Sequence, residues 1–174
     1  KDITLIDANV LSEAYIEYKM ALIKTYSFED FRYVMFDDKC IFDWMVYSQI
    51  SHHLPKDVKQ FFDEIMLLQE ETEYRSAHYY QEFSDLNILN GVVNHLPHTE
   101  FSEFYHSKEA YKKLQAILRA KDYKLSYIVS RLEDFPKRLP EKYDVILLSN
   151  IYDYVFKPKF KSILNKLYQT NLKN

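Results

Sequence analysis

The segment Ile3-Thr4-Leu5-Ile6-Asp7-Ala8-Asn9-Val10-Leu11 begins with a short apolar, partly β-branched run that stops at an acid. Such a run predicts a β-strand over Ile3 to Ile6. An acid that closes a buried strand of an open α/β sheet lies at the carboxyl edge, where ligands bind, and there it can accept both hydroxyls of a ribose. The other interpretation is that Asp7 and Asn9 only cap the following helix.

The segments that follow this strand are mostly helical in pattern. Apolar residues spaced three and four apart predict a helix from Ser12 to Tyr26. Ser27 is a typical N-cap residue, and Asp30 three positions later resembles a capping box. Residues 38–121 continue in the same helical manner, and we expect residues 37–105 to form a helical insertion or lid.

The last third of the chain changes character. Leu125 to Val129 is a candidate strand, and Pro136 and Pro140 indicate a loop. Tyr143-Asp144-Val145-Ile146-Leu147-Leu148-Ser149-Asn150 lacks polar alternation, which predicts a strand buried on both faces, as in a parallel sheet. Lys159 to Leu172 then predicts a helix. Strand, helices, two strands and a helix, in that order, indicate an α/β fold.

Composition excludes several classes of protein. The chain has 174 residues, 23 Lys and Arg and 26 Asp and Glu, so its formal charge is 23 − 26 = −3 and it lacks the basic field of general nucleic-acid binders. Gly91 is its single glycine, which excludes a Gly-rich phosphate loop within it. No apolar run is long enough to predict a membrane-spanning helix. Cys40 is the single cysteine, which suits a reducing compartment, and we expect a cytoplasmic protein.

Two further segments could carry chemistry. Ile128 to Pro136 is a strand followed by acids and a proline, which is common in nucleotide-binding α/β folds, although a plain solvated loop has the same pattern. The strand from Tyr143 would deliver Ser149 and Asn150 to the carboxyl edge, with aromatic residues after them to wall a pocket. A strand-to-helix turn capped by Asn is the structural alternative.

The histidines give no metal signature. His95 and His98 are spaced as His-x-x-His and His106 follows, but this spacing does not fit a zinc site and no cysteines assist. We therefore predict ordinary surface or half-buried histidines and no bound metal. The aromatic stripes of the helices are expected to form the core.

The first segment is similar to the opening of PIN-domain ribonucleases, in which an apolar run precedes Asp-x-Asn-x-Leu. That resemblance implies a nuclease that uses Mg²⁺ or Mn²⁺, with Asp7 as its first metal ligand and Asp134 or Asp153 among the others. The later segments typical of that family are not found in this chain.

The order of the segments resembles a class I S-adenosylmethionine-dependent transferase. Asp7-x-Asn9, the run Tyr18 to Lys24, and Ser27 to Phe31 are similar to the family of S-adenosylmethionine:diacylglycerol 3-amino-3-carboxypropyl transferases, which also has a Leu-Ser-Asn-Ile-like strand end. The resemblance covers roughly residues 2–36 and 104–155.

The resemblance implies a role for individual residues. Asp7 would bind the ribose hydroxyls of S-adenosylmethionine, with Asn9 beside it. Leu132, through its backbone, and Glu133 would contact the adenine, although Arg131 stands where many relatives have an acid. Ser149 and Asn150 would face the methionine part of the cofactor or the acceptor. The residues placed near the acceptor are Asn150, Tyr152 and Asp153.

The chain departs from that family in its first strand. The Gly-rich turn that grips the methionine carboxylate is missing, and we expect it to precede Lys1, so that the chain is a fragment. The sequence thus predicts a partial Rossmann-like, class I methyltransferase-like parallel sheet in one domain spanning residues 1–174. The expected function is methyl or 3-amino-3-carboxypropyl transfer to a small-molecule or lipid acceptor. The alternatives are the nuclease and a non-catalytic interaction module.

Overall fold

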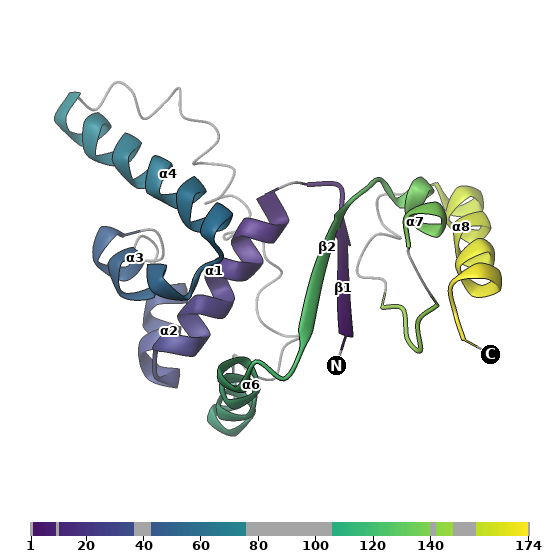
Figure 1. The fold of residues 1–174 in the computed structure, drawn as a ribbon, viewed down its shortest axis with the longest axis horizontal. Coiled ribbons are helices and arrows are strands. Elements are labelled where there is room, and N and C mark those ends of the chain that lie inside the picture. The colour runs from purple at the N-terminus through teal and green to yellow at the C-terminus, as the bar shows by residue number, and fades with distance from the viewer. Residues whose placement is uncertain are drawn as a thin grey trace. The chain divides into compact units, whose positions relative to one another are not determined.

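The computed structural model describes residues 2–9, 11–36, 43–75, 106–139, 142–147 and 156–173. The fold is mixed α/β, mostly helical, with a small parallel sheet (Figure 1). The chain divides into two compact units. One, the sheet unit, joins Lys1–Ser12 to Lys124–Asn174, and the other, the helical unit, is Glu13–Tyr123. No helix in the described ranges is both long and apolar enough to cross a membrane.

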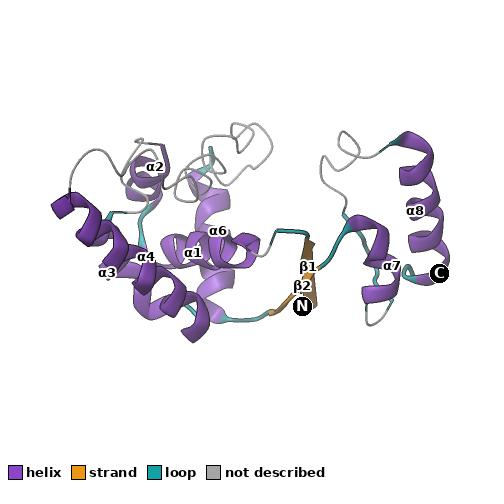
Figure 2. Cartoon of the chain, turned by 90° about the horizontal axis from the view of Figure 1, so that it is seen from above, coloured by secondary structure: helices purple, strands orange, loops and turns teal. Residues whose placement is uncertain are grey.

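The sheet consists of two parallel strands, β1 (Asp2–Asp7) and β2 (Lys124–Val129), drawn in orange in Figure 2. Asp2 pairs with Lys124 at one end and Asp7 with Val129 at the other. Strands were predicted over Ile3 to Ile6 and Leu125 to Val129, and both are confirmed; the structure adds that they are parallel neighbours. Because they are parallel, their carboxyl ends lie at the same edge of the sheet.

The sheet unit continues with η4 (Leu132–Asp134), α7 (Phe135–Arg138) and α8 (Lys157–Thr170). The buried side chains of Phe135, Ile163 and Leu167 form its core. The expected loop at Pro136 is in fact the first turn of α7, where proline is tolerated because its missing N–H has no partner in a first turn anyway. Helix α8 agrees with the predicted C-terminal helix to within two residues at each end.

The strand predicted over Tyr143 to Asn150 is not formed in its described part. Tyr143 makes an isolated parallel bridge with Leu172, and residues 145–147 have no regular structure. Leu147 is 90% exposed, whereas the prediction required burial on both faces. A strand needs a neighbouring strand to complete its ladder, and Tyr143 instead exchanges backbone hydrogen bonds with Asn171 and Lys173 after α8. Residues 148–150 lie outside the described residues.

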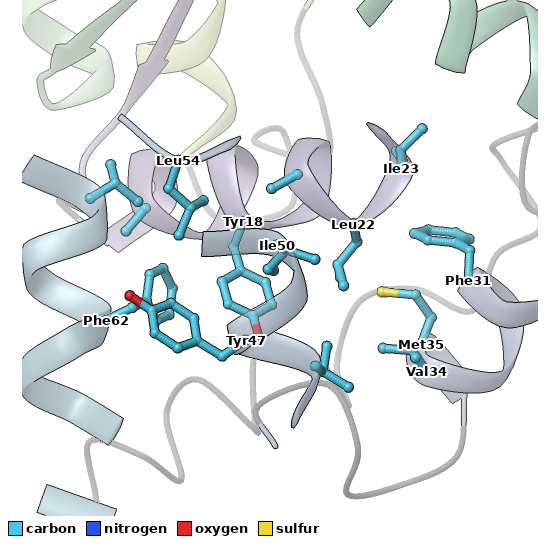
Figure 3. Close-up of a cluster of buried hydrophobic side chains, with 14 of the residues drawn as sticks. Tyr18, Leu22, Ile23, Phe31, Val34, Met35, Tyr47, Ile50, Leu54 and Phe62 are labelled. Atoms are coloured by element: carbon cyan, nitrogen blue, oxygen red, sulfur yellow. The ribbon is translucent and has the colours of Figure 1, made fainter. Parts of the chain in front are cut away.

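The helical unit is built around α1 (Leu11–Thr25), with α2 (Phe28–Phe36), α3 (Trp44–Ile50), η1 (Ser51–His53), α4 (Lys56–Arg75) and α6 (Lys108–Ala120). Tyr18 and Leu22 of α1 lie among side chains of α3 and α4 (Figure 3). The ring centroids of Tyr18 and Phe62 are 4.6 Å apart. The predicted aromatic core is confirmed for the buried rings of the described residues.

Side-chain caps fix the starts of these helices. The Ser27 hydroxyl accepts the Asp30 backbone N–H at 3.1 Å and donates to the Asp30 carboxylate at 2.7 Å, so the predicted Ser27 cap is confirmed. Ser107 accepts the N–H of Ala110 at 3.2 Å and caps α6 in the same way.

Of the helical insertion predicted for residues 37–105, the described part is 43–75, which contains α3, η1 and α4.

Candidate functional site

The carboxyl edge of β1 and β2 is the candidate site, named here the sheet edge and consisting of Asp7, Asn9 and residues 130–133. The backbone N–H of Ser130 donates to the carbonyl of Asp7 at 2.9 Å, which continues the ladder one residue beyond the strands. Ser130 is buried, and its hydroxyl donates to the carbonyl of Arg131 at 3.1 Å. The turn after β2 is therefore held against the end of β1.

Asp7 and Asn9 form the turn that leads from β1 into α1. The Asp7 carboxylate accepts the backbone N–H of Asn9 at 2.7 Å, and the Asn9 side-chain oxygen accepts the N–H of Leu11 at 3.0 Å. The Asn9 carbonyl accepts the N–H of Ser12 at 3.1 Å. This is the capping arrangement that the sequence offered as an alternative to ligand binding.

Capping does not exhaust the acceptor capacity of Asp7. A carboxylate has two oxygens and about four lone-pair sites, and the Asn9 N–H occupies one of them. The Asp7 and Asn9 side chains are both exposed. The turn therefore orients the Asp7 carboxylate and still allows it to accept hydroxyl groups of a ligand.

Glu133 lies in η4, directly after β2, and is engaged by a cation. The Lys159 ammonium, in the first turn of α8, donates to its carboxylate. This hydrogen bond is the largest of the influences that hold the pKa of Glu133 below its ordinary value. Glu133 is therefore anionic at neutral pH, and a ligand that donates to the same oxygen would share it with Lys159. Leu132 begins η4, three residues after the end of β2.

The other predicted site residues lie outside the described residues. These are Ser149 of the cofactor-binding set and Asn150, Tyr152 and Asp153 of the acceptor set. The structure thus brings together Asp7, Asn9 and the Leu132–Glu133 pair at one edge. Within the described ranges, no group of three or more His, Cys, Asp or Glu residues could hold a metal ion.

Two polar residues of this region were missed by the sequence interpretation. Lys159 was placed in the predicted C-terminal helix without a role, yet it pairs with Glu133. The Tyr143 hydroxyl, which donates to Thr4 Oγ1 at 3.1 Å, ties the segment after α7 to β1. Neither contact has a local sequence signal, because its two partners are far apart in the chain.

A hollow on α2 is another candidate site. It has a volume of about 390 Å³ and is lined by Phe28, Glu29, Arg32 and Tyr33. Its charged groups already have partners in the fold. Glu29 pairs with Lys108 at 2.6 Å, and the Arg32 guanidinium lies 5.7 Å from the ring centroid of Phe28. The sheet edge, which follows from strand topology, is the better candidate.

Comparison of the chain with protein-family models, with curated proteins and with solved structures finds no match.

Proposed function

We propose that this protein is an S-adenosylmethionine-binding transferase that transfers a methyl or a 3-amino-3-carboxypropyl group to a small-molecule or lipid acceptor. The observation that carries the proposal is the register of the parallel pair. It sets exposed Asp7 opposite Val129, so that Asp7 and the turn containing Glu133 share one edge. Ligands of open parallel sheets bind outside the carboxyl ends of the strands.

The adjacency of the two strands supports this proposal. In the strand order 3-2-1-4-5 of a doubly wound sheet, strands 2 and 3 are parallel neighbours. The resemblance described above assigns β1 to strand 2 and β2 to strand 3, and these two are parallel neighbours here.

The chemistry of the donor and acceptor groups fits an adenosine ligand. The Asp7 carboxylate would accept hydrogen bonds from the two ribose hydroxyls. It is a charged acceptor, and the Asn9 N–H holds it in place. The backbone of Leu132 and the carboxylate of Glu133 would lie beside the adenine. In the proposal Ser149 faces the methionine part, and Asn150, Tyr152 and Asp153 surround the acceptor.

The residues of such a site would act mainly by positioning. S-adenosylmethionine supplies a carbon made electrophilic by its sulfonium neighbour. The protein would hold the acceptor nucleophile in line with that carbon, remove a proton from it where needed, and exclude water. Asp153 is the carboxylate of the acceptor set and the group we assign to accept that proton.

Calorimetric titration with S-adenosylhomocysteine tests the proposal. The protein is expected to bind it, and Asp7→Asn is expected to weaken binding about tenfold or more, because a neutral amide accepts hydroxyl bonds less strongly than a carboxylate. Asp7→Asn retains an oxygen for the Asn9 N–H, so the turn into α1 should survive. Asp144→Asn is the control, since Asp144 is an exposed carboxylate paired with Lys173 in the same unit.

The opposite outcomes are equally informative. Unchanged affinity of Asp7→Asn would remove the ribose contact from the proposal, and no binding by the wild-type protein would remove the cofactor. A parallel titration with Mn²⁺ addresses the nuclease. Tight Mn²⁺ binding that Asp7→Asn abolishes, without binding of S-adenosylhomocysteine, would contradict the transferase and favour the nuclease.

A further inference from the structure

A group of positively charged and titratable side chains gathers where three elements of the helical unit end. Lys24 lies in the last turn of α1, His52 and His53 close η1, and Arg119 and Lys121 stand at the end of α6. We name these five residues the cationic cluster. All belong to the helical unit, so they are separate from the sheet edge.

A direct contact holds two of these element ends together, and electrostatic influences relate them to the third. Arg119 Nε donates to the carbonyl of Lys24 at 2.8 Å, which ties the end of α6 to the end of α1. The ring centroids of His52 and His53 are 4.0 Å apart, so the two imidazoles are presented as a pair. Lys121 follows α6 in a left-handed conformation with φ of 54°. The His52, His53, Arg119 and Lys121 side chains are exposed.

The groups that lower the pKa of His53 are of one kind. Partial burial is the main cause, and His52, Lys24, Arg119 and Lys121 lower the pKa further. These four groups are a second imidazole and three cations. Glu17 is the acid that acts on Lys24, where it opposes the effects of burial and of Lys121.

The helix ends explain part of this arrangement. Carbonyls at the end of a helix carry partial negative charge, and cations in the last turn offset it. Arg119 serves that role through its bond to the Lys24 carbonyl. Two lysines and two imidazoles remain beside it, in a chain whose formal charge is −3. The ion pairs Lys113–Glu109 and Lys59–Asp63 of this unit involve none of the five residues.

We propose that the cationic cluster binds a tetrahedral oxyanion, the phosphate group of a small-molecule ligand or free phosphate. Lysine ammonium groups provide point charges for phosphate oxygens, and imidazole N–H groups provide directed donors. A dianion placed among them relieves the mutual repulsion of the cations. It also favours the charged form of His53, so binding is coupled to proton uptake at that residue.

Nuclear magnetic resonance of the histidine side chains tests the proposal on the full chain at constant ionic strength. Sulfate is the first probe, because its charge does not change between pH 5.5 and 8. It is expected to shift the His52 and His53 resonances saturably, to raise the pKa of His53, and to bind more weakly at pH 8 than at pH 5.5. Inorganic phosphate and glycerol phosphate are then compared, and the tighter ligand tells whether free phosphate or a phosphate ester is preferred.

Three variants separate binding from folding. Lys24→Gln and Lys121→Gly each remove one cation and are expected to weaken oxyanion binding about tenfold. Lys121→Gly also removes the side-chain penalty of the left-handed backbone at this position. The variant should therefore bind the oxyanion more weakly while its thermal stability is unchanged or higher. The control is Lys113→Gln, which removes an exposed cation of α6 that is paired with Glu109.

The proposal is overturned by any of three results. These are unsaturable histidine shifts, equal weakening in Lys113→Gln, and a His53 pKa that sulfate leaves unchanged. Any of them would mean that the cations only stabilise the helix ends. The outcome is independent of the titration with S-adenosylhomocysteine, because the two sites share no residue.

Discussion

Lys19 places an amine on the apolar face of α1. It is half-buried, and its ammonium lies 4.8 Å from the ring centroid of Tyr15. Burial lowers its pKa from 10.5 to about 8, because the charged form is poorly solvated there. The cation–π contact with Tyr15 recovers part of this cost. Lys19 therefore opposes folding at neutral pH.

Replacement of Lys19 by methionine should stabilise the protein. We expect Lys19→Met to raise the free energy of unfolding at pH 7 by about 1 kcal/mol, since methionine fills a similar volume without a charge. Between pH 8 and 10.5 the unfolded chain binds more protons at this residue than the folded one, so wild-type stability rises with pH. The advantage of the variant should be full below pH 8 and shrink above it. Urea unfolding of both proteins across this pH range measures it, and a difference independent of pH would contradict the assignment to Lys19.

At the scale of elements, α6 ends on a residue that is unusual for its conformation. Lys121 has φ of 54°, in the left-handed region where glycine has no side-chain penalty. Lys121→Gly is therefore expected to stabilise the protein by about 0.5–1 kcal/mol. Thermal unfolding checks this, with Lys113→Gly inside the same helix as the matched comparison. Lys113→Gly should lower the free energy of unfolding by about 1 kcal/mol. If both variants changed the stability in the same direction, the role of Lys121 as a left-handed C-cap would be contradicted.

Elements with strong local signals were predictable from the sequence. The apolar spacing of α1, the cap at Ser27 and the β-branched run of β1 depend on neighbours within one or two turns. The strand expected at Tyr143 failed over its described part because an apolar run does not specify its pairing partner. In the structure that partner is Leu172, beyond α8.

In the candidate site too, contacts between near neighbours in the chain were predictable and contacts between distant residues were not. The turn made by Asp7 and Asn9 follows from residues two apart, and the sequence predicted both its capping role and its position at the sheet edge. The pairing of Glu133 with Lys159 joins residues 26 apart, and no periodicity indicates it. The cationic cluster also joins three separate elements; its histidines are exposed, in agreement with the prediction of surface or half-buried residues, but no local pattern indicated their cationic neighbours.

At the scale of the whole molecule, the two units differ in how much core they contain. Among the described residues, the helical unit has 17 buried hydrophobic residues in one cluster and the sheet unit has three. Burial of apolar area is the main favourable term in folding. We therefore expect the sheet unit to open locally at lower free energy than the helical unit.

Native-state hydrogen exchange measures this difference. Backbone amides of β1 and α8 should exchange faster than those of α1 and α6 under the same conditions. A ligand of the sheet edge should slow exchange in β1 and β2, whereas an oxyanion at the cationic cluster should slow it near η1. Equal protection of α8 and α1 without ligand would show that the size of the described cores does not set local stability.

The register of the sheet also has a consequence for the order of assembly. Asp2 pairs with Lys124, so the first rung of the ladder closes a chain separation of 124 − 2 = 122 residues. Closing so long a loop in an unfolded chain is entropically costly, whereas a folded helical unit has already removed most of that freedom. We therefore expect helix packing to come first and strand pairing to follow. A substitution that loosens the core around Tyr18 would reduce the fraction of molecules with an assembled sheet edge, without touching any residue of that edge.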